Sequence, residues 1–133
     1  MRKIILICVL SCISFVMSAQ THQLSSHILD ISTGHPAPNV TIKLHKLDAS
    51  KAWKLIDENI TDKNGRITNF LPYNSMSNNG TYKLTFETLP YFTKNNIDSF
   101  YPFIEVVFTI KDNAHYHVPI TISPFGYATY KGN

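Results

Sequence analysis

Regular alternation of apolar and polar residues is the feature that most constrains the fold of this 133-residue chain. In GTYKLTFE, residues 80–87, the side chains of Tyr82, Leu84 and Phe86 fall on one side of an extended strand, opposite the polar ones. The same pattern recurs in NVTIKLHK (39–46) and FIEVVFTIK (103–111). A period of two residues predicts half-buried β-strands.

Turn-forming residues separate these segments, as in TGHPAPN (33–39), DKNG (62–65), SMSNNG (75–80) and SPFG (123–126). We predict eight strands, at 23–30, 40–47, 53–60, 67–71, 81–87, 103–111, 115–122 and 126–131. Only the segment 89–100 is suited to a helix, and a short one. Short strands at regular spacing with little helix predict a single all-β sandwich domain.

The first 19 residues have the layout of a secretory signal peptide, with a basic start, an apolar run and Ser18-Ala19 before the cleavage point. We therefore expect residues 1–19 to be removed and residues 20–133 to form one exported domain, in a bacterial periplasm. An alternative lipoprotein interpretation would use Cys12, but the apolar run continues past that residue.

Removal of this segment changes the charge and cysteine balance. Cys8 and Cys12 would leave with the signal peptide, so the mature domain would have no disulfide. Arg2 and Lys3 would leave too, which turns 12 basic residues into 10 against 9 acidic ones, a net charge of +1. Nucleic-acid binding needs a clustered basic face, and this balance does not favour it.

The segment HYHVPITIS (115–123) combines a strand pattern with two histidines. Tyr116 and Val118 point towards the core, so His115 and His117 share the polar face, roughly 7 Å apart by strand rise. Pro119 has no backbone N–H to give to a neighbouring strand, which predicts an edge or an irregular pairing at that point.

Other residues suggest chemistry less specifically. His27 lies in the first strand on a face with Ser25 and Leu29, and Arg66 is the only arginine after residue 19. A guanidinium offers a planar pair of donors to carbonyl oxygens. Each of these residues could equally be a solvated or structural side chain. The His-x-His pair also occurs in metal sites, but no cysteine remains and no spaced carboxylate completes a ligand set.

Four separated segments resemble the transthyretin-related 5-hydroxyisourate hydrolases. They are LSSHILDISTGHPAPNVTIKL (24–44), TDKNGRI (61–67), DSFYPFIEVVFTI (98–110) and HYHVPITISPFGYATY (115–130). The resemblance runs in the same order over essentially the whole chain after the signal peptide. It implies a transthyretin-like sandwich of two four-stranded sheets with one short helix, assembled as a homotetramer with active sites where the dimers meet.

The resemblance also implies an activity, the hydrolysis of 5-hydroxyisourate to 2-oxo-4-hydroxy-4-carboxy-5-ureidoimidazoline in urate breakdown, without a metal or organic cofactor. Carried over by position, the catalytic set is His27, Arg66 and His117. An imidazole that titrates near neutrality can take a proton from water and return one later. His115 matches the pattern too, but we expect it to be structural.

The last four residues are expected to bind substrate, and they depart from the family pattern. The hydrolases end in Tyr-Arg-Gly-Ser, whereas this sequence has Tyr130, Lys131, Gly132 and Asn133. Lysine keeps the charge of arginine but loses its two-pronged geometry. The alternative function is therefore a non-catalytic exported protein that holds a small ligand in the manner of transthyretin.

Overall fold

The computed structural model describes residues 20–133. The predicted signal peptide, residues 1–19, lies outside the described residues, and so do both cysteines. Among the residues described, no helix combines the length and the apolarity needed to cross a membrane.

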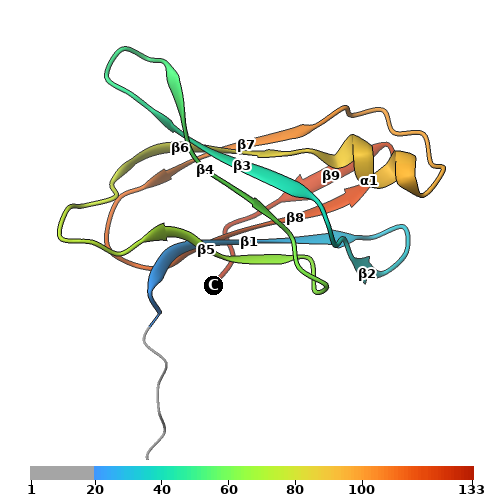
Figure 1. Cartoon of the computed structure of the whole chain (residues 1–133), viewed down its shortest axis with the longest axis horizontal. Coiled ribbons are helices and arrows are strands. Elements are labelled where there is room, and N and C mark those ends of the chain that lie inside the picture. Colours follow the sequence, from blue (N-terminus) through green and yellow to red (C-terminus); the bar gives the residue numbers. More distant parts are fainter. Residues whose placement is uncertain (1–19) are drawn as a thin grey trace, which may run out of the picture.

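Two β-sheets pack face to face and form the two layers seen in Figure 1. The first sheet has the order β2-β1-β8-β9, with β5 paired to another part of β1. Its strands are β1 (His22–Asp30), β2 (His35–Pro36), β5 (Arg66–Pro72), β8 (Tyr116–Ser123) and β9 (Gly126–Thr129). The second sheet has the order β4-β3-β6-β7, with β3 (Thr41–Leu47), β4 (Trp53–Ile60), β6 (Gly80–Phe86) and β7 (Ile104–Ile110).

The core lies between the sheets, on the apolar sides that the alternation predicts. Tyr82, Leu84 and Phe86 of β6 are at most 1% exposed. They meet buried residues of β1 and β8, among them Leu24 and Ile120. Burial of one such side chain contributes about 1.5–3 kcal/mol, so this shared core fixes which face of every strand is left for solvent.

The predicted sandwich with one short helix is confirmed, and the first sheet gains the two-residue strand β2. β2 folds back on β1 within the segment predicted as a turn, where His35 pairs with Asp30. The helix α1 (Thr88–Lys94) is shorter than the segment 89–100. It ends there because Asn96 adopts a left-handed conformation with φ of 56°.

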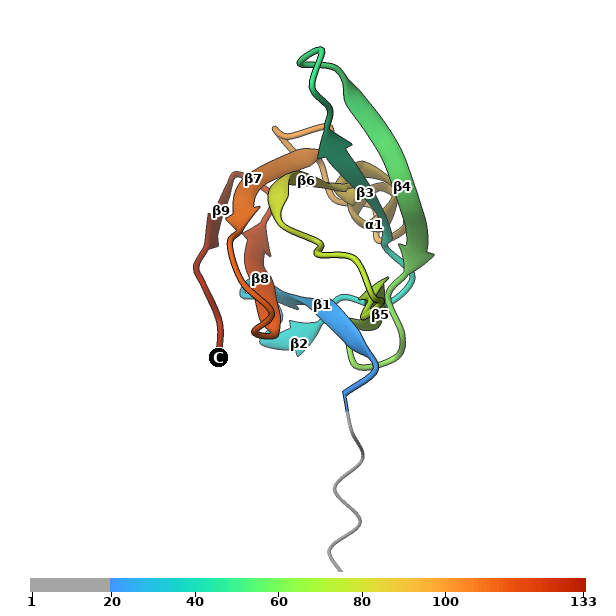
Figure 2. The same cartoon turned by 90° about the vertical axis from the view of Figure 1, so that its left-hand side faces the viewer.

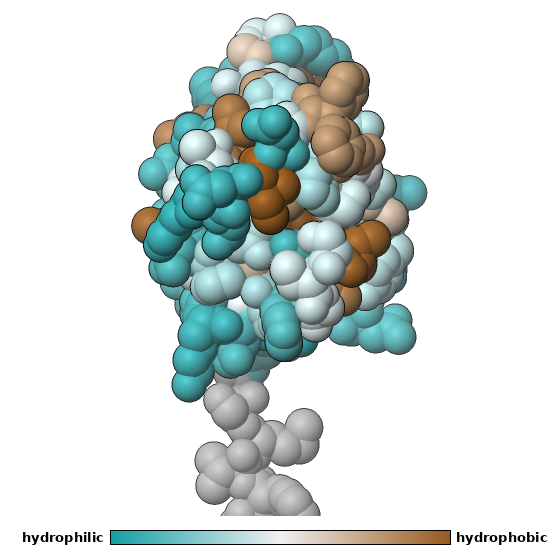
Figure 3. All heavy atoms as spheres, turned by 90° about the vertical axis from the view of Figure 1, so that its right-hand side faces the viewer, coloured by the Kyte–Doolittle hydropathy of each residue, from teal (hydrophilic) through white to brown (hydrophobic). Residues whose placement is uncertain are grey.

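Helix α1 covers one end of the sandwich between β6 and β7. Phe92 is 1% exposed and reaches the core, and the hydroxyl of Tyr91 donates a 2.9 Å hydrogen bond to the buried Asp30. Burial and this carboxylate raise the pKa of Tyr91 to about 12. Figure 3 looks onto this end, where separate hydrophobic patches lie in a largely hydrophilic surface. The helix is therefore a structural cover.

The prediction for Pro119 is half right, because the pairing is irregular but β8 is not an edge strand. β8 lies between β1, to which it is parallel, and β9. The carbonyl of Pro119 accepts a hydrogen bond from Thr129 Oγ1, so the proline nitrogen also faces the β9 side. Regular pairing there ends at Thr129 and resumes only as the bridge between His117 and Gly132. The missing N–H therefore falls in the gap.

Strands β7 and β9 end their respective sheets on the same side of the molecule. Figure 2 shows these two edges next to each other, with the C-terminal segment descending beside β8. A sheet edge presents unpaired backbone groups, so this side of the sandwich carries two adjacent pairing surfaces.

Candidate active site

The outer face of the first sheet gathers the predicted catalytic residues. β1 and β8 run parallel in a register that sets Ser25 beside His117 and His27 beside Pro119. Since side chains alternate along a strand, Ser25, His27 and His117 all lie on the face away from the core. β5 runs antiparallel to β1 and sets Arg66 opposite His27. Three strands distant in sequence thus converge on one surface.

Arg66 owes its place to the tight turn before β5. The Asp62 carboxylate accepts hydrogen bonds from the backbone N–H groups of Asn64 and Arg66, at 2.8 and 2.9 Å. Gly65 has φ of 69°, and a Cβ there would lie 2.6 Å from the Ile28 carbonyl oxygen. Glycine is therefore required for the turn to lie against β1, which delivers Arg66 to the edge of the histidine surface.

A cavity of about 420 Å³ opens on this surface, a size suited to a small molecule. Residues from both ends of the chain line it: Gln20, Ser25, Ser26, Arg66, Thr68, His115, His117 and Asn133. His27 lies beside it, with its ring centroid 6.4 Å from that of His117 and the two planes 21° apart. The structure therefore brings His27, Arg66 and His117 together, as predicted from the resemblance.

Hydrogen bonds tie His117 to Ser25 and, through Ser25, to His115, two residues of the cavity that the sequence did not place in the catalytic set. The Nδ1 atom of His117 lies 2.7 Å from Ser25 Oγ. The same hydroxyl oxygen lies 2.8 Å from Nε2 of His115. Ser25 was visible in the sequence only as a residue on the face of His27, because its partners depend on the register of β1 against β8.

The C-terminal segment divides between two places. The backbone N–H of Gly132 donates a 2.9 Å hydrogen bond to the carbonyl of His117. A Cβ on Gly132 would lie 2.5 Å from Cδ2 of His117, so only glycine lets the segment lie this close to the imidazole. Asn133 follows and lines the histidine cavity. Two of the four predicted substrate-binding residues therefore lie at the cavity.

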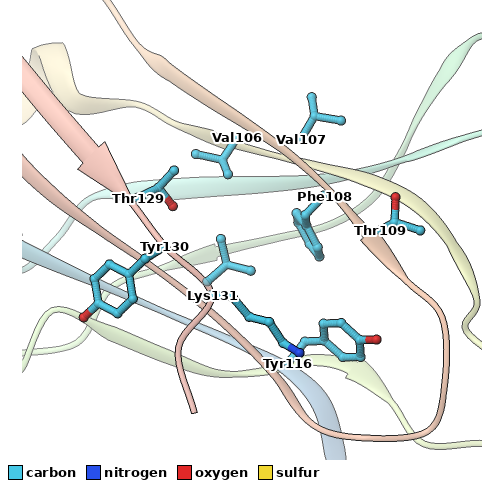
Figure 4. A pocket seen from close by; sticks show the side chains of 9 residues that line it. Val106, Val107, Phe108, Thr109, Tyr116, Thr129, Tyr130 and Lys131 are labelled. Carbon is cyan, nitrogen blue, oxygen red and sulfur yellow. The ribbon is translucent and has the colours of Figure 1, made fainter.

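The other two, Tyr130 and Lys131, line a separate apolar groove of about 260 Å³ between β7 and β9. Figure 4 shows the Lys131 side chain extending towards the Tyr116 ring, and its Nζ lies 5.4 Å from the ring centroid. Tyr130 points elsewhere, and 61% of its surface is exposed. Within one chain, neither side chain lines the histidine cavity.

The electrostatics of the cavity favour neutral imidazoles. Burial lowers the pKa of His117, and the positive charge of Arg66 lowers it further. Burial and then Arg66 likewise lower the pKa of His27, against a smaller opposing effect of Asp62. Each ring is therefore neutral at pH 7, with a nitrogen lone pair able to accept a proton.

Metal binding has little support among residues 20–133. No group of three or more histidine, cysteine, aspartate or glutamate side chains there is arranged to hold an ion. His115 and His117 instead share one serine hydroxyl between their ring nitrogens. What the arrangement offers is a neutral base beside a guanidinium, a pair suited to activating water next to a polarised carbonyl.

Comparison with known proteins gives a consistent family. The sequence profile of the HIUase/Transthyretin family matches residues 24–132. A probable 5-hydroxyisourate hydrolase of Caenorhabditis elegans is 45% identical over 114 residues, covering 85% of this chain and 83% of the relative. The 5-hydroxyisourate hydrolase of Mus musculus is 38% identical, covering 88% of this chain and 100% of the relative.

Solved structures agree in fold. The 5-hydroxyisourate hydrolase of Klebsiella pneumoniae superposes with a TM-score of 0.71 at 36% identity, covering 83% of this chain and 98% of that one. Sea bream transthyretin in complex with thyroxine gives a TM-score of 0.77 at 31% identity, covering 83% and 94%. The predicted resemblance and fold class are both confirmed.

Proposed function

The chain belongs to the HIUase/Transthyretin family, and we propose that it is an enzyme, a 5-hydroxyisourate hydrolase. The observation that carries the proposal is the convergence of His27, Arg66 and His117 from three strands on one small-molecule cavity. The curated relatives named as hydrolases of this substrate support it.

In the proposed reaction, water adds across a carbonyl–nitrogen bond of the 5-hydroxyisourate ring. His117 takes a proton from the attacking water, whose oxygen bonds to the ring carbonyl carbon. The carbon–nitrogen bond then breaks, the nitrogen gains a proton, and the carbon becomes the carboxyl of 2-oxo-4-hydroxy-4-carboxy-5-ureidoimidazoline. The base is supplied by a side chain of the protein, and no metal or organic cofactor takes part.

Arg66 would stabilise the negative charge that develops on the attacked carbonyl oxygen, and His27 would assist proton transfer. A guanidinium beside the attacked carbonyl stabilises the oxyanion and holds the substrate through two parallel hydrogen bonds. No ion pair involves Arg66 among the residues described, so its charge is free to meet a ligand. His27 stacks near His117 and is placed to share the water or to protonate the departing nitrogen.

We propose that the C-terminal residues complete the substrate site in two ways. Asn133 offers an amide that can both donate to and accept from the ring at the cavity, and Gly132 lets it approach. Tyr130 and Lys131 would contact substrate only through an assembly that brings their groove next to a cavity.

Such an assembly is the second part of the proposal, a homotetramer with active sites at the dimer–dimer interface. The neighbouring β7 and β9 edges and their apolar groove favour edge-to-edge pairing of two copies. The histidine-bearing outer face would then meet another dimer. Light scattering coupled to gel filtration tests this, since a monomer at micromolar concentration would contradict it.

We also propose that residues 1–19 direct export, to the periplasm in a bacterial host, with cleavage after Ala19. The basic-apolar-small layout of the segment supports this. Mass spectrometry of the secreted protein should find Gln20 at the N-terminus. An intact Met1 in the soluble extracytoplasmic fraction would contradict it.

The decisive experiment generates 5-hydroxyisourate from urate with urate oxidase and follows its ultraviolet absorbance. The purified protein, residues 20–133, should accelerate the decay in proportion to its concentration. A decay at the spontaneous rate would overturn the hydrolase proposal.

One observation favours a second function, the likeness to transthyretin in complex with thyroxine. Lys131 and Asn133, which depart from the hydrolase ending, add to it. A non-catalytic carrier should bind an iodinated phenol tightly by calorimetry and leave hydroxyisourate decay unchanged. Acceleration of the decay without such binding would exclude it.

A further inference from the structure

A chain of three side chains runs behind His117, from a backbone carbonyl to the catalytic ring. Nδ1 of His115 lies 3.1 Å from the His22 carbonyl oxygen, and Nε2 of His115 lies 2.8 Å from Ser25 Oγ. Ser25 Oγ in turn lies 2.7 Å from Nδ1 of His117. We call these residues, His115, Ser25 and His117, the relay.

The direction of each hydrogen bond follows from the carbonyl at its start. A backbone carbonyl only accepts, so Nδ1 of His115 carries the hydrogen. In the neutral ring Nε2 of His115 is then the acceptor, and the Ser25 hydroxyl donates to it. The Gln20 amide also approaches this nitrogen, but at 3.2 Å. The serine oxygen is left to accept from Nδ1 of His117.

This order fixes the tautomer of His117. With its hydrogen on Nδ1, the ring carries its free lone pair on Nε2, and no protein group within residues 20–133 bonds to that atom. The relay therefore does for His117 what a carboxylate does for the histidine of a serine protease, with neutral groups.

We propose that Ser25 and His115 are positioning residues, which hold His117 with Nε2 as the base and take up the proton that it receives. The inference rests on the proposed function. When Nε2 of His117 takes a proton from water, Nδ1 passes its proton to Ser25 Oγ, and Ser25 passes its own to Nε2 of His115. The charge then rests on His115, and the reverse sequence returns a proton to the departing ring nitrogen.

Among residues 20–133, the groups around the relay offer the proton no competing carboxylate side chain. The charged and titratable side chains that act on His117 are Arg66 from β5, His27 from β1 and His115 of the relay itself, and none is a carboxylate. Asn133 lines the cavity with an amide side chain. A proton taken up by His117 therefore finds its hydrogen-bonded outlet in Ser25.

Ser26 provides a matched control. It is the neighbour of Ser25, it is 1% exposed, and its hydroxyl donates a 2.8 Å hydrogen bond to the Val118 carbonyl. Ser25 is 7% exposed and faces the histidines instead. Both serines join β1 to β8, so a purely structural role predicts similar effects for Ser25→Ala and Ser26→Ala.

The test reads the tautomer directly, by nitrogen-15 NMR of the His117 ring at pH 8 in the apo protein. We expect the hydrogen on Nδ1 in the wild type and in Ser26→Ala. In Ser25→Ala and in His115→Phe, we expect the tautomer that is commoner in free histidine, with the hydrogen on Nε2. Ser25→Thr, which keeps a hydroxyl, should restore the Nδ1 form.

Kinetics supply a second readout. Ser25→Ala should lower kcat about tenfold or more with KM within about threefold, and Ser25→Thr should recover part of the loss. A wild-type His117 with its hydrogen on Nε2 would overturn the relay, and so would Ser25→Ala indistinguishable from Ser26→Ala in both readouts. Because the tautomer is measured without substrate, an Nδ1 form in a protein with no hydrolase activity would uphold the relay while overturning the proposed function. If Ser25→Ala does not fold, His115→Phe decides by the same two readouts.

Discussion

Both outer faces of the sandwich carry histidine, His45 on the second sheet and His27 and His117 on the first, yet their polar groups are organised differently. On the second sheet, His45 lies among long charged side chains that pair with one another, Lys83 with Glu105 and Lys43 with Glu87, each at 3.0 Å. On the first sheet the Ser25 hydroxyl joins His115 and His117, and the nearby Arg66 has no ion pair among the described residues. Paired surface charges are typical of a solvated face. An unpaired guanidinium next to neutral imidazoles is typical of a site that binds a ligand or transfers protons.

Removal of one histidine from each face should give the largest difference in activity between the two faces. His117→Ala takes away the proposed base, so kcat should fall by about 100-fold or more. His45→Ala should leave kcat within about twofold, since His45 lies in β3 of the second sheet and does not line the cavity. Steady-state kinetics of the two variants compare the faces, and equal losses would erase the distinction.

The cations of the two faces allow the next test. Arg66→Lys keeps the charge but loses the planar pair of donors, so kcat/KM should fall by roughly 10- to 100-fold. The reciprocal control on the second sheet, Lys83→Arg, should change kcat/KM by less than about twofold. A fully active Arg66→Lys would show that charge alone is sufficient there.

A backbone contact that exists only on the first face gives a smaller effect. The Cβ of Gly132→Ala would lie 2.5 Å from Cδ2 of His117 and would push the terminal segment away from the ring. We expect kcat/KM to fall several-fold, up to about tenfold, with little change in Tm, because the segment is held by one isolated bridge. Gly126→Ala is the control, since its Cβ meets only Ser123 Oγ at 3.6 Å.

The histidines of the two faces should respond to different cations, because, besides burial, Arg66 lowers the pKa of His117 and Lys83 lowers the pKa of His45. Burial lowers the pKa of His117 and of His45 alike, with Arg66 as the next cause for the first and Lys83 for the second. NMR titration should place both midpoints below the ordinary 6.5. Arg66→Gln should raise the midpoints of His117 and His27 but not that of His45, and Lys83→Met should raise the midpoint of His45 but not those of His117 and His27.

The same lowered pKa values link stability to pH. A histidine that binds its proton less tightly in the folded state favours folding above pH 6.5, where neither state is protonated, relative to lower pH. The free energy of unfolding should therefore decline as the pH falls from 6.5 through the folded pKa values. Urea titrations at pH 7.5 and 5.5 measure this, and an increase in stability at the lower pH would contradict the sign.

The ion pairs of the second face should give the smallest effect. Glu105→Gln removes the partner of Lys83 from a half-exposed pair, and the free energy of unfolding should change by less than about 1 kcal/mol. Activity should stay unchanged, and 0.5 M salt should shrink even this difference. Urea denaturation of both proteins at low and high salt measures it, and a loss of several kcal/mol would make this face more than a solvated surface.

Much of the fold could be predicted from the sequence, because apolar and polar residues alternate with a period of two within each strand. It also grouped His27, Arg66 and His117, since they stand in recognisable motifs, and the structure brings these three residues together. The hydrogen bonds of Ser25 were beyond it, because they require the parallel register of β1 against β8, two segments about 90 residues apart. No local pattern specifies such a register.

The terminal residues show the same limit. A motif placed Tyr130, Lys131, Gly132 and Asn133 together, but the structure divides them between a polar cavity and an apolar groove. The division follows from the contact of Gly132 with His117, which depends on where β9 stops pairing.

The parallel pairing of β1 with β8 has a consequence for how the protein is made. The hydroxyl of Ser25 is synthesised about 90 residues before the ring of His117, so β1 has to wait for the strands between them before its neighbour β8 exists. A nascent or prematurely terminated product that stops before β8 leaves β1 without this partner and lacks His117 of the proposed site. The proposed site is therefore complete only after β8 has been synthesised.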